Sequence, residues 1–316
     1  MTVTTVAPVL AAGAVCWRRR GERIEVLLIS RSRHNDVSLP KGKVDGDESL
    51  PETAVREIRE ETGFEVHLGL PLGSTEYVLP NGRDKTVYYW AAEVPQAELE
   101  RGRFRPNDEV DRLDWVPVTK AGKLLSYSRD VEVLQRFAAS AAAGDLGGFR
   151  LVVLRHGKAA FDSSSGRDAD RELTSRGEAQ AKAVAPGLLA WGPRVIVSSP
   201  AARCLATVAP LAKALEVTVK KNASISQDGW EASGHDPKAI REFVARRVAK
   251  GRTAVLCSHA PVLPELMEQL ARVTGSPNGG RMTRAGILAT AEYTVLHLSP
   301  TAPHAILAME THAAAG

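Results

Sequence analysis

The sequence contains few cysteines, few aromatic residues and no long apolar run. Its three cysteines, Cys16, Cys204 and Cys257, are scattered without paired spacing, which argues against a disulfide framework or a zinc site. This usage is typical of a reducing compartment, so we expect a cytoplasmic protein. The apolar stretch at residues 6–15 is shorter than the roughly 20 residues that cross a bilayer. No basic segment precedes it, so we expect neither a signal peptide nor a membrane partner.

Aromatic residues account for only 5% of the 316 residues and do not interleave with the arginines, so the pattern that stacks nucleic-acid bases is missing. The net charge of +4 is uneven, because residues 1–140 hold 20 Lys and Arg against 22 Asp and Glu, and the remainder holds 21 against 15. The basic excess of the second part is nevertheless dispersed along the chain. We therefore do not expect nucleic acid among the partners.

The length of 316 residues exceeds that of one typical domain and predicts two. Small residues dominate the stretch 138–148, which can complete a helix and then act as a flexible linker. We therefore expect a first domain over residues 1–137 and a second domain over residues 149–316.

The first domain combines predicted strands with predicted helices. Residues 4–17, 25–30 and 86–94 are rich in β-branched or aromatic residues and predict strands. Residues 50–62 and 131–143 predict helices, and the first of these is bounded by a proline in its first turn and a glycine after its end. The mixture predicts an α+β domain.

The predicted helix 50–62 carries a concentration of acidic residues. Glu57, Glu60 and Glu61 stand at positions i, i+3 and i+4, which crowds three carboxylates on one face. A hard divalent cation removes the conflict between them, because Mg²⁺ prefers oxygen ligands. Arg56 can orient one of the glutamates by a bidentate pair. The alternative is a solvated charged face on which Glu52 pairs with Arg56.

The stretch from Gly42 to Phe64 fills every fixed position of the pattern G-x5-E-x7-R-E-U-x-E-E-x-G-U, in which U is apolar. It therefore resembles the Nudix box, and the Nudix fold is a mixed sheet between helices. In that family the loop and helix bind Mg²⁺ and hydrolyse a nucleoside diphosphate linked to another group. The resemblance implies Mg²⁺ as the cofactor, with Mn²⁺ as the alternative. It also implies these ligands: the Gly42 carbonyl, Glu48, Glu57, Glu60 and Glu61.

Two flanking stretches bear on the substrate. Lys41 and Lys43 lead into the box, and on the strand that follows Lys85 and Tyr89 share one face. Both stretches look like those of the diadenosine polyphosphate hydrolases within the Nudix family, in which the matching lysines and tyrosine hold the polyphosphate chain. A lysine suits that role as a point charge. The alternative is a surface lysine beside a core tyrosine.

A further acidic segment lies at residues 107–111. Glu109 stands six residues before Trp115, and in the same branch of the family a glutamate at this spacing returns to the metal site. Glu109 is therefore our candidate for an additional metal ligand or for the general base. Asp108 and Asp111 are its rivals, and an ordinary acidic loop is the alternative.

The second part begins with an apolar strand at residues 149–154 that ends in an Arg-His-Gly triplet at residues 155–157. The segments 195–199 and 253–258 are further strands that end in polar loops, and a helix capped by Thr174 precedes them. The alternation of strands and helices predicts an α/β domain with a mostly parallel sheet. Such sheets place ligands at the carboxyl ends of their strands.

These segments resemble the histidine phosphatase superfamily. Arg155 and His156 match its R-H-G triplet, Arg203 matches its second phosphate-binding arginine, and His259 matches its second histidine. The resemblance implies that His156 becomes phosphorylated. Two arginines and two histidines that converge on one point form an anion pocket. A neutral imidazole is an adequate nucleophile toward phosphorus near pH 7.

The second domain departs from that superfamily in two respects. Ala260 stands where the superfamily usually has glycine, and no acidic proton donor is clearly placed, with Glu231 and Asp228 as the nearest candidates. A phosphate-binding pocket with weak or lost turnover is therefore an alternative to an active phosphatase.

A Nudix domain followed by a histidine phosphatase domain resembles the two-domain MutT-type hydrolases. The resemblance implies Mg²⁺-dependent conversion of 8-oxo-(d)GTP to 8-oxo-(d)GDP, cleavage of diadenosine polyphosphates, and a role in sanitising the nucleotide pool. One alternative is a signalling phosphatase that acts through His156 while the Nudix half senses nucleotides. Another is a C-terminal half that only binds or dimerises and supplies basic residues. Nucleotides are the expected partners, while a homo-oligomer and the base selectivity stay open.

Overall fold

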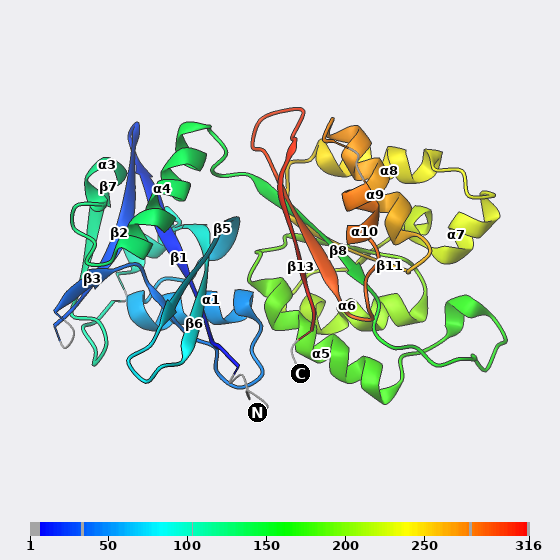
Figure 1. Ribbon diagram of the computed structural model, residues 1–316. Helices are drawn as coiled ribbons and strands as arrows, with labels where there is room; N and C mark the ends of the chain where they lie inside the picture. Colours follow the sequence, from blue (N-terminus) through cyan, green and yellow to red (C-terminus); the bar gives the residue numbers. More distant parts are fainter. Residues whose placement is uncertain (1–6, 33–34, 103, 278–279, 315–316) are drawn as a thin grey trace, which may run out of the picture. The chain divides into compact units, whose positions relative to one another are not determined.

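The computed structural model describes residues 7–32, 35–102, 104–277 and 280–314. The chain divides into two compact units, Met1–Leu146 and Gly147–Gly316, and each has its own sheet (Figure 1). None of the helices in these described ranges is both long enough and apolar enough to cross a membrane.

The first unit is built on a mixed sheet in the order β3-β2-β1-β6-β5, to which β4 adds beside β1 and β7 beside β2. β1 and β6 run parallel, and the other pairs are antiparallel. The strands are β1 (Val9–Arg20), β2 (Arg23–Arg31), β3 (Asp36–Ser38), β4 (Lys41–Lys43), β5 (His67–Val78), β6 (Asp84–Glu93) and β7 (Arg112–Pro117). The helices are α1 (Leu50–Thr62), α2 (Gln96–Arg101), α3 (Val118–Ala121) and α4 (Ser128–Ala142).

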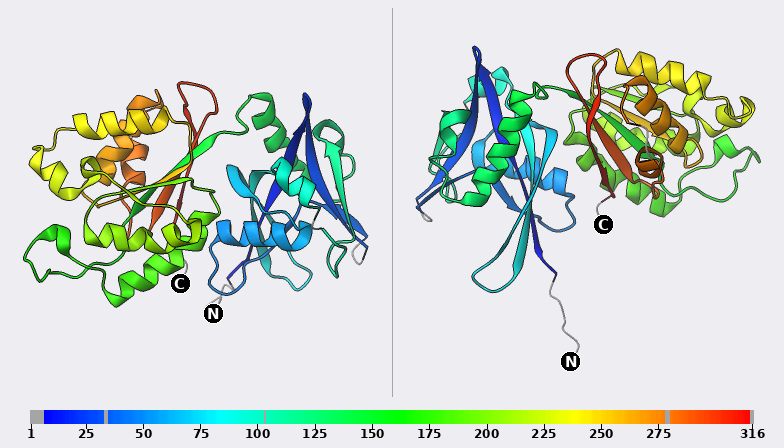
Figure 2. Two further views of the ribbon diagram at one scale, coloured as in Figure 1. Left: turned by 180° about the vertical axis from the view of Figure 1, so that it is seen from behind. Right: turned by 45° about the horizontal axis from the view of Figure 1, so that its top comes forward.

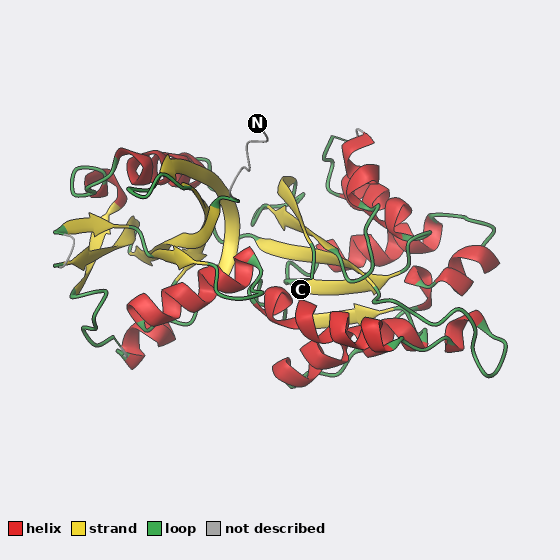
Figure 3. Cartoon of the chain, turned by 60° about the horizontal axis from the view of Figure 1, so that its bottom comes forward, coloured by secondary structure: helices red, strands yellow, loops and turns green. Residues whose placement is uncertain are grey.

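Alternation along the central strand explains why helices cover both faces of this sheet (Figure 3). Ala14 and Cys16 of β1 pack with Ile58 of α1 in one apolar cluster. Val15 and its neighbours on the opposite face pack with Phe137 of α4 in another. Successive side chains of a strand point to opposite faces, so one apolar strand serves both cores. The expected α+β fold, a mixed sheet between helices, is confirmed.

Helix α1 has the limits that its sequence predicts. Pro51 occupies the first turn, and Gly63 ends the helix with a φ of 74°, where its N–H donates to the carbonyl of Arg59 at 2.9 Å. Only glycine adopts that left-handed conformation without strain. The three predicted strands correspond to β1, β2 and β6, although residues 4–6 of the first prediction lie outside the described residues. β5 was not predicted, and α4 begins three residues before its predicted start.

The second unit has a sheet in the order β10-β9-β11-β8-β12-β13. The first four strands are parallel, and β12 and β13 are antiparallel additions at one edge. The strands are β8 (Phe149–Arg155), β9 (Val195–Ser198), β10 (Lys220–Lys221), β11 (Ala254–Ser258), β12 (Tyr293–Leu298) and β13 (Ile306–His312). The helices are η1 (Asp168–Asp170), α5 (Ser175–Leu189), α6 (Ala202–Leu215), η2 (Ala223–Ile225), α7 (Gln227–Ala232), α8 (Lys238–Val248), α9 (Leu263–Val273) and α10 (Gly280–Ala285).

Helices cover both faces of this sheet as well. One apolar cluster joins α8, α9 and α10 to the sheet, and α5 and α6 lie on the other face (Figure 2). Thr174 caps α5, because its side chain accepts a hydrogen bond from the N–H of Gly177 at 3.2 Å. The expected α/β fold with a mostly parallel sheet is confirmed. The antiparallel pair β12–β13 was not predicted.

The stretch 138–148 does not lie wholly between the units. Helix α4 continues to Ala142, and Leu146 is buried in a core cluster of the first unit. The domain limits at residues 137 and 149 therefore stay a prediction, and the division of the fold falls between Leu146 and Gly147.

Candidate functional site

A cavity of about 400 Å³ in the first unit collects most of the residues that the box predicts. It is lined by four basic and four acidic side chains together with one glycine. The lining residues are Arg31, Lys41, Gly42, Lys43, Glu57, Glu61, Lys85, Asp108 and Glu109. They come from β2, β4, α1, β6 and the loop before β7, so three strands of the sheet, the box helix and this loop together form the cavity.

Gly42 allows the Glu57 carboxylate to lie directly against the backbone of β4. A Cβ atom at this position would overlap the carboxyl carbon and both carboxylate oxygens of Glu57. Glu57 is largely buried. Burial raises the pKa of this carboxyl, and although Arg56 lowers it in part, the nearby Glu60 and Glu109 raise it further. The glycine is thus required by close approach rather than by backbone conformation.

Glu61 lies deeper in the same cavity. Its side chain accepts a hydrogen bond from the backbone N–H of Lys41 at 2.7 Å. Burial raises the pKa of Glu61 and the Lys41 ammonium opposes it, and the net result is a pKa of about 7. Burial likewise lowers the pKa of Lys41, against the opposing effect of Glu61. The two groups therefore form a desolvated acid–base pair at the cavity wall.

Arg56 is the centre of an ion-pair network on α1. Its Nε and Nη2 donate to the two carboxylate oxygens of Glu48 at 2.6 and 2.9 Å, which is the bidentate geometry expected of arginine. Its Nη1 donates to Glu57 at 2.9 Å and to Glu60 at 2.8 Å. Burial raises the pKa of Glu48, but the hydrogen bonds lower it overall. Glu52 instead accepts from the backbone of the residue that precedes the helix.

Among the predicted ligands, Glu48 and Glu60 do not line the cavity. Both pair with Arg56, and the Glu60 side chain is 52% exposed. Glu109 and its rival Asp108 both line the cavity, whereas Asp111 accepts a hydrogen bond from the backbone N–H of Ser32. Two of the three carboxylates considered in this loop thus reach the site.

The predicted phosphate-binding residues divide in the same way. Lys41, Lys43 and Lys85 line the cavity. Tyr89 does not line it, because its side chain is 2% exposed and belongs to the apolar core. Arg31 was missed by the sequence reasoning and lines the cavity while it pairs with a neighbouring aspartate. No motif singles out this arginine, so only the pairing of β2 with its neighbours reveals it.

The cavity suits a hard divalent cation in the chemistry of its donors. Carboxylates are the ligands that Mg²⁺ prefers, and Glu57, Glu61, Asp108 and Glu109 bring four of them to one cavity. No three His, Cys, Asp or Glu side chains within the described ranges stand close enough together to hold a metal ion at once. The other two predicted carboxylates are engaged by Arg56. The residues fit such an ion in kind, and the ligand set stays a prediction.

The second unit brings His156 and His259 together at the carboxyl ends of β8 and β11, with ring centroids 5.2 Å apart. His156 Nδ1 lies 2.7 Å from the carbonyl of Gly157. A carbonyl only accepts, so Nδ1 carries the proton and Nε2 keeps its lone pair. Burial, followed by the nearby His259 and the positive Arg203 and Arg155, lowers the pKa of His156 to about 3. The imidazole is therefore neutral at pH 7.

Arg203 joins the two histidines from helix α6. Its guanidinium lies 3.3 Å from His156 Nε2 and 3.0 Å from His259 Nδ1. It also donates to the carboxylate and to the backbone carbonyl of Asp168, each at 2.6 Å. Asp168, on η1, was missed by the sequence reasoning because nothing in its local sequence links it to Arg203. Of the four predicted residues of this pocket, His156, Arg203 and His259 contact one another.

The remaining predictions for this pocket are less complete. Arg155 donates to the carbonyl of Leu288 at 2.6 Å, and its Nε is buried without a hydrogen-bond partner. Glu231 and Asp228 lie exposed on α7, and Glu231 accepts from Gln227. The carboxylate that contacts Arg203 is the one on η1, so the choice of acid donor remains a prediction.

Known proteins match both halves of the chain. The Nudix domain family matches residues 7–137, and branch 1 of the histidine phosphatase superfamily matches residues 151–242. The 8-oxo-(d)GTP phosphatase of Mycolicibacterium smegmatis is 36% identical over 308 residues, which cover 92% of this chain and 92% of that protein. The asymmetrical bis(5'-nucleosyl)-tetraphosphatase of Mus musculus is 34% identical over 136 residues, which cover 40% of this chain and 90% of that protein.

A solved Caenorhabditis elegans Ap4A hydrolase binary complex covers 43% of this chain and 98% of its own, with 27% identity and a TM-score of 0.39. The mycobacterial relative, at 92% coverage, extends across both units. The chain therefore belongs to the Nudix hydrolases, as an enzyme that joins a Nudix domain to a histidine phosphatase superfamily domain.

Proposed function

We propose that the first unit hydrolyses nucleoside polyphosphates with Mg²⁺, and that its substrates are 8-oxo-(d)GTP, converted to 8-oxo-(d)GDP, and diadenosine polyphosphates. The observation that carries the proposal is the cavity in which carboxylates of α1 face the lysines of β4 and β6. The activities of the mycobacterial and murine relatives support the choice of substrates. Sanitation of the nucleotide pool is the biological role that follows.

The basic residues of the cavity bind the polyphosphate. Lys41, Lys43 and Lys85 supply point charges for phosphate oxygens, and Arg31 can add a planar donor pair. Burial lowers the pKa of Lys85, and the neighbouring Lys43 and Arg31 lower it further. A bound polyphosphate would relieve this repulsion, so substrate binding stabilises the arrangement of the cavity.

The acidic residues would ligate Mg²⁺ and accept the proton of the attacking water. Glu57 and Glu61 would ligate Mg²⁺ with the Gly42 carbonyl, Glu48 and Glu60 as the remaining predicted ligands. Bound Mg²⁺ supplies charge neutralisation of the phosphates and lowers the pKa of a water ligand. Glu109 lies at the rim, exposed, and is our candidate to take the proton from the attacking water while the anhydride P–O bond breaks.

Matched glutamate variants test this proposal. Glu61→Gln is expected to lower kcat/KM for 8-oxo-GTP and diadenosine tetraphosphate by about 10²-fold to 10⁴-fold, because it removes a carboxylate from the site. Glu132→Gln, at an exposed position on α4, is the control and should leave kcat/KM unchanged. Chromatographic identification of the products distinguishes release of orthophosphate from release of pyrophosphate. Full activity in Glu61→Gln, or activity that survives chelation of divalent ions, would contradict the proposal.

A second candidate function is hydrolysis of a phosphomonoester in the second unit. The favouring observation is the neutral His156 beside Arg203 and His259. His156→Ala should abolish hydrolysis of a phosphomonoester such as p-nitrophenyl phosphate, while Glu61→Gln should spare it. If the unaltered chain shows no such activity to lose, the second unit acts in binding alone.

A further inference from the structure

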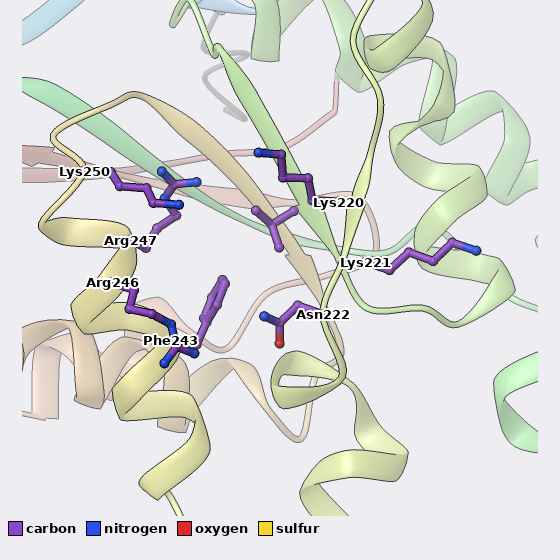
Figure 4. A pocket seen from close by; sticks show the side chains of 8 residues that line it. Lys220, Lys221, Asn222, Phe243, Arg246, Arg247 and Lys250 are labelled. Atoms are coloured by element: carbon purple, nitrogen blue, oxygen red, sulfur yellow. The ribbon is translucent and has the colours of Figure 1, made fainter.

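The second unit contains another cavity, which is strongly basic (Figure 4). Its volume is about 230 Å³, and five of its eight lining residues are Lys or Arg, with no Asp or Glu among them. It lies between the edge strand β10 and helix α8. The lining residues are Val197, Lys220, Lys221, Asn222, Phe243, Arg246, Arg247 and Lys250.

This basic cavity is separate from the histidine pocket. Helix α8 and the turn after it, which carry Arg247 and Lys250, lead into the amino end of β11. His259 follows the carboxyl end of the same strand. Arg247 and Lys250 therefore lie toward the amino end of β11. Lys220 and Lys221 lie on β10, which pairs with β9 and is separated from β11 by that strand. None of the eight lining residues belongs to the histidine pocket.

Arg247 is the central observation. The residue is only 5% exposed, and its buried Nε has no hydrogen-bond partner among the residues that the structure describes. In the described part of the chain, no carboxylate forms an ion pair with its guanidinium. Burial lowers the pKa of Arg247, and the neighbouring Arg252 lowers it further. Buried arginines are normally paired, so this side chain is placed for an anion that the chain does not supply.

Other cations reinforce this charge. Figure 4 shows the side-chain nitrogens of Lys220, Arg247 and Lys250 directed toward one another from β10 and from the end of α8, whereas Lys221 points away. Arg246 forms a long ion pair with Glu242, in which Nη1 lies 3.9 Å from the carboxylate oxygen. Lysines on an edge strand alone would be an ordinary protection against edge pairing. The buried arginine behind them is not explained in that way.

We propose that this basic cavity is a second binding site, specific for a phosphate-bearing small molecule. Guanidinium groups bind phosphate in a bidentate manner and lysines bind it as point charges. The volume corresponds to roughly eight water molecules, which suits a diphosphate group and leaves a nucleoside outside. Asn222 also lines the cavity and can donate its amide N–H to the anion, and Phe243 lines it without offering a competing acceptor. The site does not depend on the hydrolase function proposed above.

Protection of individual lysines from acetylation tests this site in the full-length chain. With inorganic pyrophosphate in metal-free buffer at constant ionic strength, the acetylation rates of Lys220 and Lys250 should fall at least fivefold by mass spectrometry. Lys213, exposed on α6, is the internal control and should react at an unchanged rate. Guanosine diphosphate forms a second arm. Protection at lower concentration than pyrophosphate identifies a nucleotide as the source, and weaker protection identifies free pyrophosphate.

Variants separate binding from a structural role. Arg247→Met should abolish the protection, and without anion its Tm should equal or exceed that of the unaltered chain, because it removes an unpaired buried charge. Lys250→Gln, at an exposed position, should weaken the protection of Lys220 even if Arg247→Met does not fold. A lower Tm together with retained protection in Arg247→Met would overturn the proposal. Equal protection by sulfate, or protection only by a single-stranded oligonucleotide, would also overturn it.

Discussion

At the level of single residues, the cavity of the Nudix unit depends on Gly42, which has no side chain. Gly42 lets the Glu57 carboxylate rest on β4, and Lys41 beside it donates its N–H to Glu61. Both glutamates therefore take their positions from the same three-residue strand. Arg56 adds a second constraint on Glu57 from the helix itself. Small displacements at these positions act directly on the carboxylates.

We predict that Gly42→Ala inactivates the hydrolase without unfolding it. The added methyl group must displace the Glu57 carboxylate, and a misplacement of about 1 Å can cost roughly 10²-fold in rate. Gly122→Ala is the control, since its φ of −61° suits alanine and its Cβ would make only ordinary contacts. Steady-state kinetics and Tm measure both variants. Unchanged kcat/KM in Gly42→Ala would show that the position of Glu57 is unimportant.

At the level of elements, the antiparallel pair β12–β13 contains a buried polar cluster. Glu310 on β13 accepts hydrogen bonds from His297 at 2.7 Å and from His312 at 3.0 Å. Burial alone would raise the pKa of Glu310, but these hydrogen bonds lower it to about 2 from an ordinary value of 4.5. Burial lowers the pKa of His297. The cluster thus joins an ionised carboxylate to a neutral imidazole across the two strands.

This cluster predicts how stability responds to acid. The folded state holds the Glu310 carboxylate ionised, so its contribution is complete above pH 4.5 and is lost as the pH falls toward 2. Glu310→Gln should therefore lower the free energy of unfolding by about 1–3 kcal/mol at pH 7 and by much less at pH 2.5. Urea denaturation followed by circular dichroism measures both. The control is the exposed Glu172→Gln; an equal loss in both variants would exclude the cluster as the cause.

At the scale of the whole molecule, the first unit contains all the residues of its own cavity. Every residue that lines the Nudix cavity belongs to the first unit, which also has its own cores. The last buried residue of those cores is Leu146, nine residues beyond the predicted domain limit. An intact Nudix site is therefore expected from a chain that ends at residue 146 and not from one that ends at 137.

Two truncations test this expectation. Residues 1–146 should keep kcat/KM within about tenfold of the full chain, a difference of about 1.4 kcal/mol in transition-state stabilisation. Residues 1–137 should have a lower Tm, because they lose the end of α4 and the burial of Leu146, which is worth about 2–5 kcal/mol. Kinetics and thermal unfolding measure both. If residues 1–146 fold but are inactive, the second unit supplies residues to the site.

Prediction from sequence succeeded where chemistry is local. The limits of α1, the Thr174 cap and the strands that end in His156 and His259 follow from residues adjacent in the chain. β5, β12 and β13 were missed, although β5 pairs with the next strand β6 and β12 pairs with the next strand β13. Arg31 and Asp168 were missed because each meets the other residues of its site only through contacts between elements that are distant in sequence.

By itself, the sequence determined the two folds, the family and the residue types available for chemistry, because spacing along a helix or a strand places side chains on a common face. Tertiary structure alone decided which of those residues meet. It brought Glu57, Glu61 and the three lysines to one cavity, and it left Glu48 and Glu60 outside that cavity and Tyr89 in the core. It also left Arg247 buried, with no hydrogen-bond partner for its Nε in the described ranges. The reason is that burial and long-range pairing depend on contacts between elements, which no local pattern contains.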